Sequence, residues 1–463
     1  MRLPGEILLV AGYELGHQPL AVAWPAAFLE RLGYHPAVMD VSVEPFDAMR
    51  ATRAKLVAIS VPMHTALRVG VVAAARVRAV NPNAHLCFYG LYASLNAEYL
   101  LGHGADSVIG GETEAPLVDL VRAIEIGDHG AVAGVRTREH LASPHLRRLE
   151  FPVPSRAQLP PLSTYVRLER DGHRDIVGYV EASRGCRHLC RHCPIPPVYG
   201  GRFFAVPRDV VLADIRQQVA AGATHITFGD PDFLNGPTHA VRIARELHAQ
   251  MPAVTFDFTA KIEHLNAHRE HLPELASCGC LFIVSAAESL SDVVLDHLDK
   301  GHTRADIVAA LHATREAGIA LRPTWVAFTP WTTLGDYREM LDFIETEDLV
   351  DHVEPVQYSL RLLVPPGSLL AASPAMRPHL GPLEQAAFSQ TWTHPDSRMD
   401  HLQDAVTTIV TRASERRDDP AATFDQVRAL ANEVAGAPAS AGVSARLGPD
   451  RRRPPRLTEP WFC

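Results

Sequence analysis

Two blocks of the chain alternate short apolar runs with longer amphipathic stretches, and a proline-rich stretch separates them. In the first block, EILLVAG at 6–12 predicts a strand, and 19–34 predicts a helix that ends at Gly33. Strands that alternate with helices predict an α/β fold with a parallel, doubly wound sheet, whose ligands bind at the carboxyl ends of the strands. The other elements of this block are expected at 36–41, 56–62, 66–80, 85–90, 94–103, 106–111 and 114–126.

The second block begins at residue 176. Six strand–helix units predict a partial (β/α)6 barrel, in which functional residues belong on the loops at the carboxyl ends of the strands. A helix at 305–318 is an example of the connections between strands. The six strands are expected at 176–183, 224–230, 254–260, 280–286, 320–328 and 352–360.

A length of 463 residues is too great for one ordinary core, so several domains are expected. Residues 434–463 are rich in Ala, Gly, Pro and Arg, which predicts a flexible tail that ends in Cys463. The predicted organisation is a Rossmann-like domain (1–127), a linker (128–175), the barrel (176–375), a helical region (376–433) and the tail (434–463).

The charge and hydropathy of the chain argue against two classes of partner. The formal net charge is −9, so we expect no nucleic acid as a partner, because phosphate binding needs a basic face. No apolar run approaches the ~20 residues of a membrane span, and Glu6 interrupts the start of the first apolar run, so we expect neither a membrane anchor nor a signal peptide. These features predict a cytoplasmic protein.

Three of the seven cysteines, Cys186, Cys190 and Cys193, stand in a C-x3-C-x2-C spacing after a predicted strand. Such clustering in a cytosolic chain points to metal or redox chemistry. Three thiolates on one short loop can hold three irons of a [4Fe–4S] cluster and leave the fourth iron open to another ligand.

The alternative is a structural zinc site in which His188 or His192 completes the three cysteines. Structural zinc sites usually draw their ligands from two separated pairs. Cys278 and Cys280 stand at the start of another predicted strand and are not suitably placed to supply a second pair.

The segment SRGCRHLCRHCP (183–194) resembles the signature of the radical S-adenosylmethionine (SAM) superfamily. The resemblance implies a [4Fe–4S] cluster whose open iron binds SAM. It also implies that one electron, from a donor such as a ferredoxin or flavodoxin, cleaves SAM to a 5′-deoxyadenosyl radical. That radical would abstract hydrogen from a small-molecule or peptide substrate that the sequence does not identify. In this chemistry the protein positions and shields the cofactor.

The same resemblance assigns candidate SAM contacts on two barrel loops. GDPDF (229–233) takes the place of the motif that binds the SAM amino group, so Asp230 and Asp232 are candidates. In SAAESLSDVVLDHLDKGHT (285–303), Ser285 and Glu288 are expected near the SAM ribose or carboxylate. The alternatives are an ordinary turn aspartate and an acid that favours a helix N-terminus.

The front block resembles the cobalamin domain of cobalamin-binding radical SAM proteins, through ADSVIGGETEAPL (105–117) and through candidate contacts at Ser60 and Gly90. This implies cobalamin as a further cofactor and methyl transfer as the reaction. The chain departs from the family at E-L-G-H (14–17), which replaces D-x-H-x-x-G and leaves His17 as a weak candidate for a cobalt ligand. A front domain without cobalamin, serving a rearrangement, cyclisation or thioether-forming enzyme, stays open, as does a zinc-stabilised binding protein.

The carboxyl-terminal RLTEPWFC resembles the aromatic-rich stretch of radical SAM proteins with a Cys-(selenocysteine or Cys)-Ala-Glu-Pro tail. Cys463 is therefore predicted as a catalytic thiol, and a selenocysteine codon read as a stop would produce this ending. The alternative is a frayed terminus with an incidental thiol.

Overall fold

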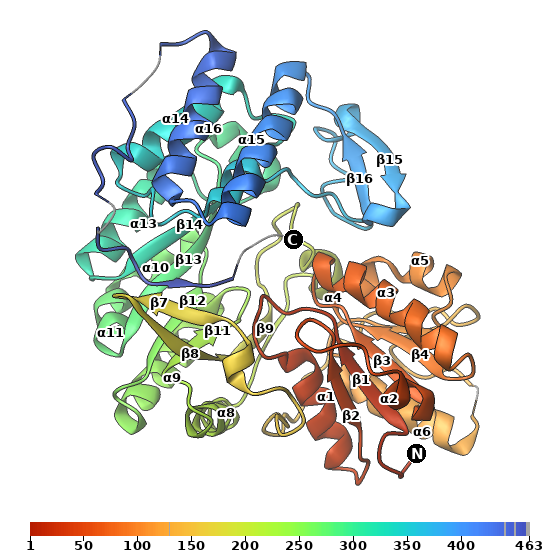
Figure 1. The fold of residues 1–463 in the computed structure, drawn as a ribbon. Helices are drawn as coiled ribbons and strands as arrows, with labels where there is room; N and C mark the ends of the chain where they lie inside the picture. Colours follow the sequence, from red (N-terminus) through yellow and green to blue (C-terminus); the bar gives the residue numbers. More distant parts are fainter. Residues whose placement is uncertain (129, 439–440, 449–450, 460–463) are drawn as a thin grey trace.

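The computed structural model describes residues 1–128, 130–438, 441–448 and 451–459. It confirms the predicted α/β class, with a front domain and a barrel side by side and a helical carboxyl-terminal region beyond the barrel (Figure 1). No helix among these residues is both long and apolar enough to cross a bilayer. Cys463 lies outside the described residues, so the structure does not test its predicted role.

The front sheet has the strand order β2-β1-β3-β4-β5-β6, in which all pairs are parallel except β5 with β6. On β1, Ile7, Leu9 and Ala11 belong to the same core as α1 and α6, whereas Leu8 and Val10 face α2 and α3, so the sheet is covered on both faces. The elements are β1 Ile7–Ala11, α1 Leu20–Glu30, β2 Ala37–Asp40, α2 Ala48–Arg53, β3 Leu56–Ser60, α3 His64–Val80, β4 His85–Tyr89, α4 Leu91–Leu95, α5 Ala97–Gly102, β5 Ser107–Ile109, α6 Glu114–Ile126 and β6 Val135–Arg136.

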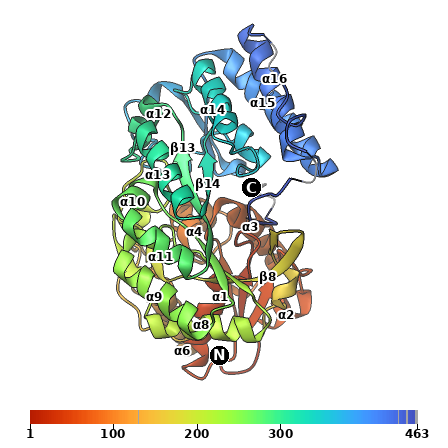
Figure 2. The same ribbon diagram turned by 90° about the vertical axis from the view of Figure 1, so that its left-hand side faces the viewer.

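The barrel sheet has the order β14-β13-β12-β11-β8-β7-β17, and its first five strands are parallel. Helices lie along its outer side (Figure 2). The antiparallel hairpin β7–β8 joins the end of the predicted linker to the first expected barrel strand. The elements are β7 Arg167–Arg170, β8 His173–Val180, α8 Arg208–Ala220, β11 His225–Phe228, α9 Pro237–Gln250, β12 Thr255–Thr259, α10 Ile262–Ala267, α11 Leu272–Ser277, β13 Cys280–Glu288, α12 Asp292–Leu298, α13 Arg304–Glu316, β14 Ala320–Trp325 and α14 Leu334–Thr346.

The sixth barrel strand, expected at 352–360, is replaced by a short 3₁₀ helix, Pro355–Ser359. Pro355 has no N–H for a strand ladder, and the side chain of Gln357 accepts a hydrogen bond from the backbone N–H of Trp325 at 2.9 Å. An isolated parallel bridge between Phe328 and Arg361 marks the place of the missing strand.

The region expected to be helical from residue 376 begins with a hairpin, β15 Leu380–Glu384 and β16 Ser389–Trp392. The helices α15 Ser397–Arg416 and α16 Pro420–Ala435 follow it. Phe388, at the turn of the hairpin, packs edge-on against Tyr99 of the front domain at 4.9 Å between ring centroids. The hairpin therefore ties the carboxyl-terminal region to the front domain.

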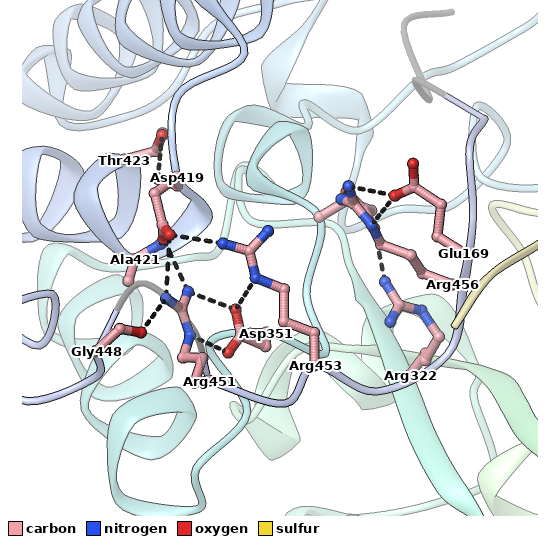
Figure 3. A network of polar contacts seen from close by, with 11 residues as sticks. Glu169, Arg322, Asp351, Asp419, Ala421, Thr423, Gly448, Arg451, Arg453 and Arg456 are labelled. Atoms are coloured by element: carbon pink, nitrogen blue, oxygen red, sulfur yellow. Dashed lines mark hydrogen bonds and ion pairs between the residues drawn. The ribbon is translucent and has the colours of Figure 1, made fainter. Parts of the chain in front are cut away.

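Residues 451–459, expected as part of a flexible tail, lie as a strap along the barrel edge, and β17 (Arg456–Leu457) pairs antiparallel with β7. Arg451 binds two carboxylates, Asp351 at 2.7 Å and Asp419 at 2.8 Å (Figure 3). The hydrogen bonds from Arg451 lower the pKa of Asp419 to about 2. The basic residues thus order this part of the chain because acidic partners face them.

Candidate active site

The three-cysteine loop lies between two short antiparallel strands, β9 (Ser183–Gly185) and β10 (Phe203–Ala205). Gly185 begins the loop with φ +76°, and a Cβ at this position would lie 2.4 Å from the carbonyl oxygen of Arg202. Only glycine fits such a conformation and approach without strain. Cys186 and Cys190 are buried, and Cys193 is half-buried. The loop follows β8, so it stands at the carboxyl ends of the barrel strands, as predicted.

All three loop cysteines are free thiols. Burial, and then the neighbouring thiolates, raise the pKa of Cys193 to about 12. Thiols that are buried or half-buried on one loop need bound cations to become thiolates, and iron in a cluster supplies that charge. Cys280 begins β13 and Cys278 directly follows α11, so both lie at the opposite end of the barrel and supply no fourth sulfur.

The geometry argues against one zinc ion on the loop. Two sulfurs bound to the same zinc at about 2.3 Å lie at most about 4.6 Å apart. Among the described residues, three ligand atoms converge within 4.8 Å at one place, and that place does not include the cysteines. His188 Nε2 lies 3.1 Å from His264 Nε2, and His192 Nε2 lies 3.1 Å from Glu288 Oε1, so both candidate zinc histidines face other loops. Among the described residues, the three sulfurs therefore do not close around a single ion.

Asp230, a predicted SAM contact, holds the base of the cysteine loop. One carboxylate oxygen accepts a hydrogen bond from the backbone N–H of Ala182 at 2.7 Å, and the other accepts one from the Ser183 hydroxyl at 2.5 Å. Burial raises the pKa of Asp230 to about 7. Both oxygens are therefore engaged with the strand that leads into the loop.

Asp232, in the same loop after β11, is completely buried, and its Oδ1 accepts a hydrogen bond from the backbone N–H of Leu234 at 3.0 Å. Its Oδ2 lies 2.7 Å from Nδ1 of His264. The sequence reasoning did not single out His264. The spacing of His264, His268 and His271 along one stretch is the signal that could have drawn attention to it.

Glu288 ends β13 with φ +65° and points at the cysteine loop. Its Oε1 lies 3.2 Å from Lys300 Nζ and 3.1 Å from Nε2 of His192, the residue directly before Cys193. Burial alone would raise the pKa of Glu288, but Lys300 and His192 hold it well below its usual range. Ser285 instead donates to the carbonyl oxygen of Ala260 at 2.6 Å. Of these two predicted SAM contacts, Glu288 is brought to the loop and Ser285 is tied to the backbone.

The carboxyl ends of the front-domain strands face the barrel. Arg184, directly before Gly185, forms ion pairs with Glu114 at 2.7 Å and Glu112 at 3.5 Å, and its guanidinium lies 4.3 Å from the Trp24 ring. Sequence reasoning missed Arg184, although GGETE, which supplies both glutamates, was noted. The cysteine loop and the front domain therefore share one buried ionic contact.

The remaining front-domain candidates lie at the same sheet edge. Ser60 ends β3, and Gly90 follows β4 with φ +107°, where a Cβ would lie 3.2 Å from the carbonyl oxygen of Val61. His17 is buried rather than exposed on a loop, and its ring stacks on Tyr179 of the barrel at 4.5 Å. Burial lowers the pKa of His17 to about 3.

Residues 180–344 match the sequence profile of the family described as the radical SAM superfamily. The chain is 30% identical over 200 residues to the tRNA-2-methylthio-N(6)-dimethylallyladenosine synthase of Desulfosudis oleivorans, which covers 41% of this chain and 42% of that protein. It is 21% identical over 263 residues to the ribosomal protein uS12 methylthiotransferase RimO of Chlorobium phaeobacteroides, covering 50% of this chain and 59% of that protein. The chain thus spans about half the length of these curated relatives.

Two solved structures share the fold over most of the chain. The cobalamin-dependent SAM radical enzyme OxsB, with aqua-cobalamin and SAM bound, superposes with a TM-score of 0.70 at 14% identity, covering 91% of this chain and 70% of that one. The radical SAM methyltransferase TsrM from Kitasatospora setae, with cobalamin and a [4Fe–4S] cluster bound, superposes with a TM-score of 0.60 at 18% identity, covering 75% and 71%. The order of front domain and barrel is therefore one that solved radical SAM enzymes use.

Proposed function

We propose that this chain, whose residues 180–344 match the radical SAM superfamily profile, is an enzyme that binds a [4Fe–4S] cluster through Cys186, Cys190 and Cys193. When bound, the cluster and SAM would supply reductive cleavage of SAM to a 5′-deoxyadenosyl radical that abstracts hydrogen from a substrate. The observation that carries the proposal is the placement of three cysteines, none of them in a disulfide, on one loop at the carboxyl ends of the barrel strands.

The surrounding residues position that loop. Asp230 fixes the strand before the first cysteine, and Glu288 reaches His192, directly before the third. The buried Lys300 ammonium pairs with Glu288 at 3.2 Å and offsets negative charge beside the thiolates. In the proposal, SAM lies over this end of the barrel, with Glu288 as the acidic group nearest the cysteine loop. The substrate is a small molecule or a peptide.

Anaerobic reconstitution with iron and sulfide tests the cluster. We expect about four irons and four sulfides per chain, and loss of both when any one of the three cysteines is replaced by alanine. One zinc ion per chain, retained after reconstitution, would instead support the zinc-stabilised binding protein. Dithionite can replace the expected ferredoxin or flavodoxin as the electron donor.

We further propose that the front domain binds cobalamin and that the enzyme transfers a methyl group. The support is the shared two-part fold with OxsB and TsrM, together with Ser60 and Gly90 at the sheet edge that faces the barrel. Growth with added cobalamin should give a purified protein with corrinoid absorbance. A purified protein without corrinoid absorbance after such growth would remove this part of the proposal and leave the cluster chemistry unaffected.

The second candidate is a radical SAM enzyme with a front domain that does not bind cobalamin, acting in rearrangement, cyclisation or thioether formation. Its support is that residues of this chain occupy part of the front-sheet edge that faces the barrel. The Tyr13 hydroxyl contacts Glu459 of the strap, and a Cβ on Gly16 would clash with that carboxylate. Methylated product from methyl-labelled SAM separates the candidates, because only methyl transfer moves the label to substrate.

A further inference from the structure

A second group of ligand-type side chains lies beside the cysteine loop. His188 belongs to the loop itself, Asp232 follows β11, and His264 lies on α10 after β12. One ligand atom from each lies within 4.8 Å of the other two. Two ligands at about 2.1 Å from a single ion lie at most about 4.2 Å apart. A pair of these atoms at 4.8 Å would need to close by about 0.6 Å to reach that limit and further to reach tetrahedral angles, which side-chain rotation can supply.

The contacts within the group leave ligand atoms without hydrogen-bond partners. Asp232 Oδ2 and His264 Nδ1 are 2.7 Å apart but do not have hydrogen-bonding geometry, and neither atom has another hydrogen-bond partner among the described residues. Asp232 is 0% exposed. A buried carboxylate oxygen without a proton donor costs free energy, and a bound cation removes that cost.

The charges around the group favour a cation. Glu263 Oε2 lies 3.5 Å from His188 Nδ1 and adds a second carboxylate at the rim. Lys261 is the nearby opposing charge, but its ammonium pairs with Glu263 at 3.2 Å. Among the described residues, His264 is thus the one side chain within ion-pairing distance of the Asp232 carboxylate.

We propose that His188, Asp232 and His264 bind one first-row divalent cation, of the zinc or ferrous iron class, beside the cysteine loop and separate from its cluster. Two imidazoles and one carboxylate suit these ions, whereas magnesium and calcium take mostly oxygen ligands. The ion would tie the loop between Cys186 and Cys190 to the segments that follow β11 and β12. The site does not depend on the proposed radical chemistry.

The test uses the full-length protein after cluster reconstitution and removal of excess metal. Zinc is titrated in, and bound zinc is counted by elemental analysis beside iron. We expect one zinc per chain beyond the cluster iron. Asp232→Asn and His264→Gln should weaken its binding by at least about 10-fold while iron and sulfide stay unchanged. His268→Gln, on the segment after α10 and outside the group, is the matched control and should bind zinc as the unaltered protein does.

Cobalt in place of zinc keeps the test decisive if the variants fold poorly. Cobalt on the proposed site has nitrogen and oxygen ligands, so its visible bands should appear without thiolate-to-cobalt charge transfer. No added ion, equal binding in Asp232→Asn, or a thiolate band would overturn the site. Formation of 5′-deoxyadenosine, measured on the same samples, reports separately on the proposed function.

Discussion

Arg184 Nη1 lies 2.7 Å from Glu114 Oε1, and this buried ion pair joins the front domain to the residue that stands two positions before the first loop cysteine. Glu112 and Glu181 also contact the guanidinium, at 3.5 and 3.1 Å. One cation thus serves three carboxylates. The position of the cysteine loop is thereby coupled to the position of the front domain.

Arg184→Met should lower the free energy of unfolding by about 3 kcal/mol, because it leaves buried carboxylates without their cation. Denaturant unfolding measures the change. The matched control is Arg122→Ala, which removes an exposed pair with Asp119 on α6 and should cost less than about 0.5 kcal/mol. Equal losses in both variants would contradict the role given to Arg184.

Gly185→Ala should abolish cluster assembly, because φ is +76° and the added Cβ would meet the carbonyl oxygen of Arg202 at 2.4 Å. Iron content and visible absorbance after reconstitution measure the effect. Gly200→Ala is the control. Gly200 has φ +57° near the same loop but open space around its Cβ, so that variant should keep its iron at a cost of about 1 kcal/mol in stability. Full iron content in Gly185→Ala would show that the backbone can adapt.

Glu14 makes stability depend on pH. Burial, and then Glu181, raise the pKa of Glu14 to about 8, above its value in the unfolded chain. The folded protein therefore binds more protons, and its stability falls as pH rises from about 4.5 to about 8. Glu14→Gln keeps an acceptor for the Ala21 N–H. Across that pH window, the free energy of unfolding of this variant should fall by a few kcal/mol less than that of the unaltered protein.

Unfolding curves at several pH values check the Glu14 prediction. The exposed Glu415 on α15 provides the control, since Glu415→Gln should follow the unaltered protein at every pH. Parallel pH profiles for Glu14→Gln and the unaltered protein would count against the raised pKa of Glu14.

Arg451→Ala should release the strap, because Arg451 binds both Asp351 and Asp419. Hydrogen exchange of residues 451–459 should become faster, and β17 should lose its protection. The neighbouring Arg452 pairs with Asp171 but its side chain is 84% exposed, so Arg452→Ala should leave exchange almost unchanged. Unchanged exchange in Arg451→Ala would mean that β17 pairing and the ion pairs of Arg453 and Arg456 hold the strap without Arg451.

Local patterns in the sequence predict much of this fold. The alternation of apolar runs gives both sheets, and the position of Cys186 after a strand places the loop at the correct end of the barrel. The failures come from contacts between distant residues. At the edge of β14, the side chain of Gln357 accepts the hydrogen bond of the Trp325 N–H. A sixth strand is therefore not needed there, and the apolar run at 352–360 forms none.

The same limit applies to the site. The spacing of the cysteines is a local signal, whereas Arg184 with Glu114 and His264 with Asp232 meet across 70 and 32 positions of sequence respectively. The strap is a further case, since its arginines look like a solvated tail until Asp351 and Asp419 are placed opposite them. Only the folded chain brings these charges together.

Release of 5′-deoxyadenosine tests the central claim most directly. The reconstituted protein is incubated with SAM and dithionite under anaerobic conditions, beside the single variants Cys186→Ala, Cys190→Ala and Cys193→Ala. We expect 5′-deoxyadenosine and methionine from the unaltered protein and none from the three variants. A reconstituted protein that carries the cluster but leaves SAM intact, or a cysteine variant that cleaves SAM at the full rate, would contradict the account.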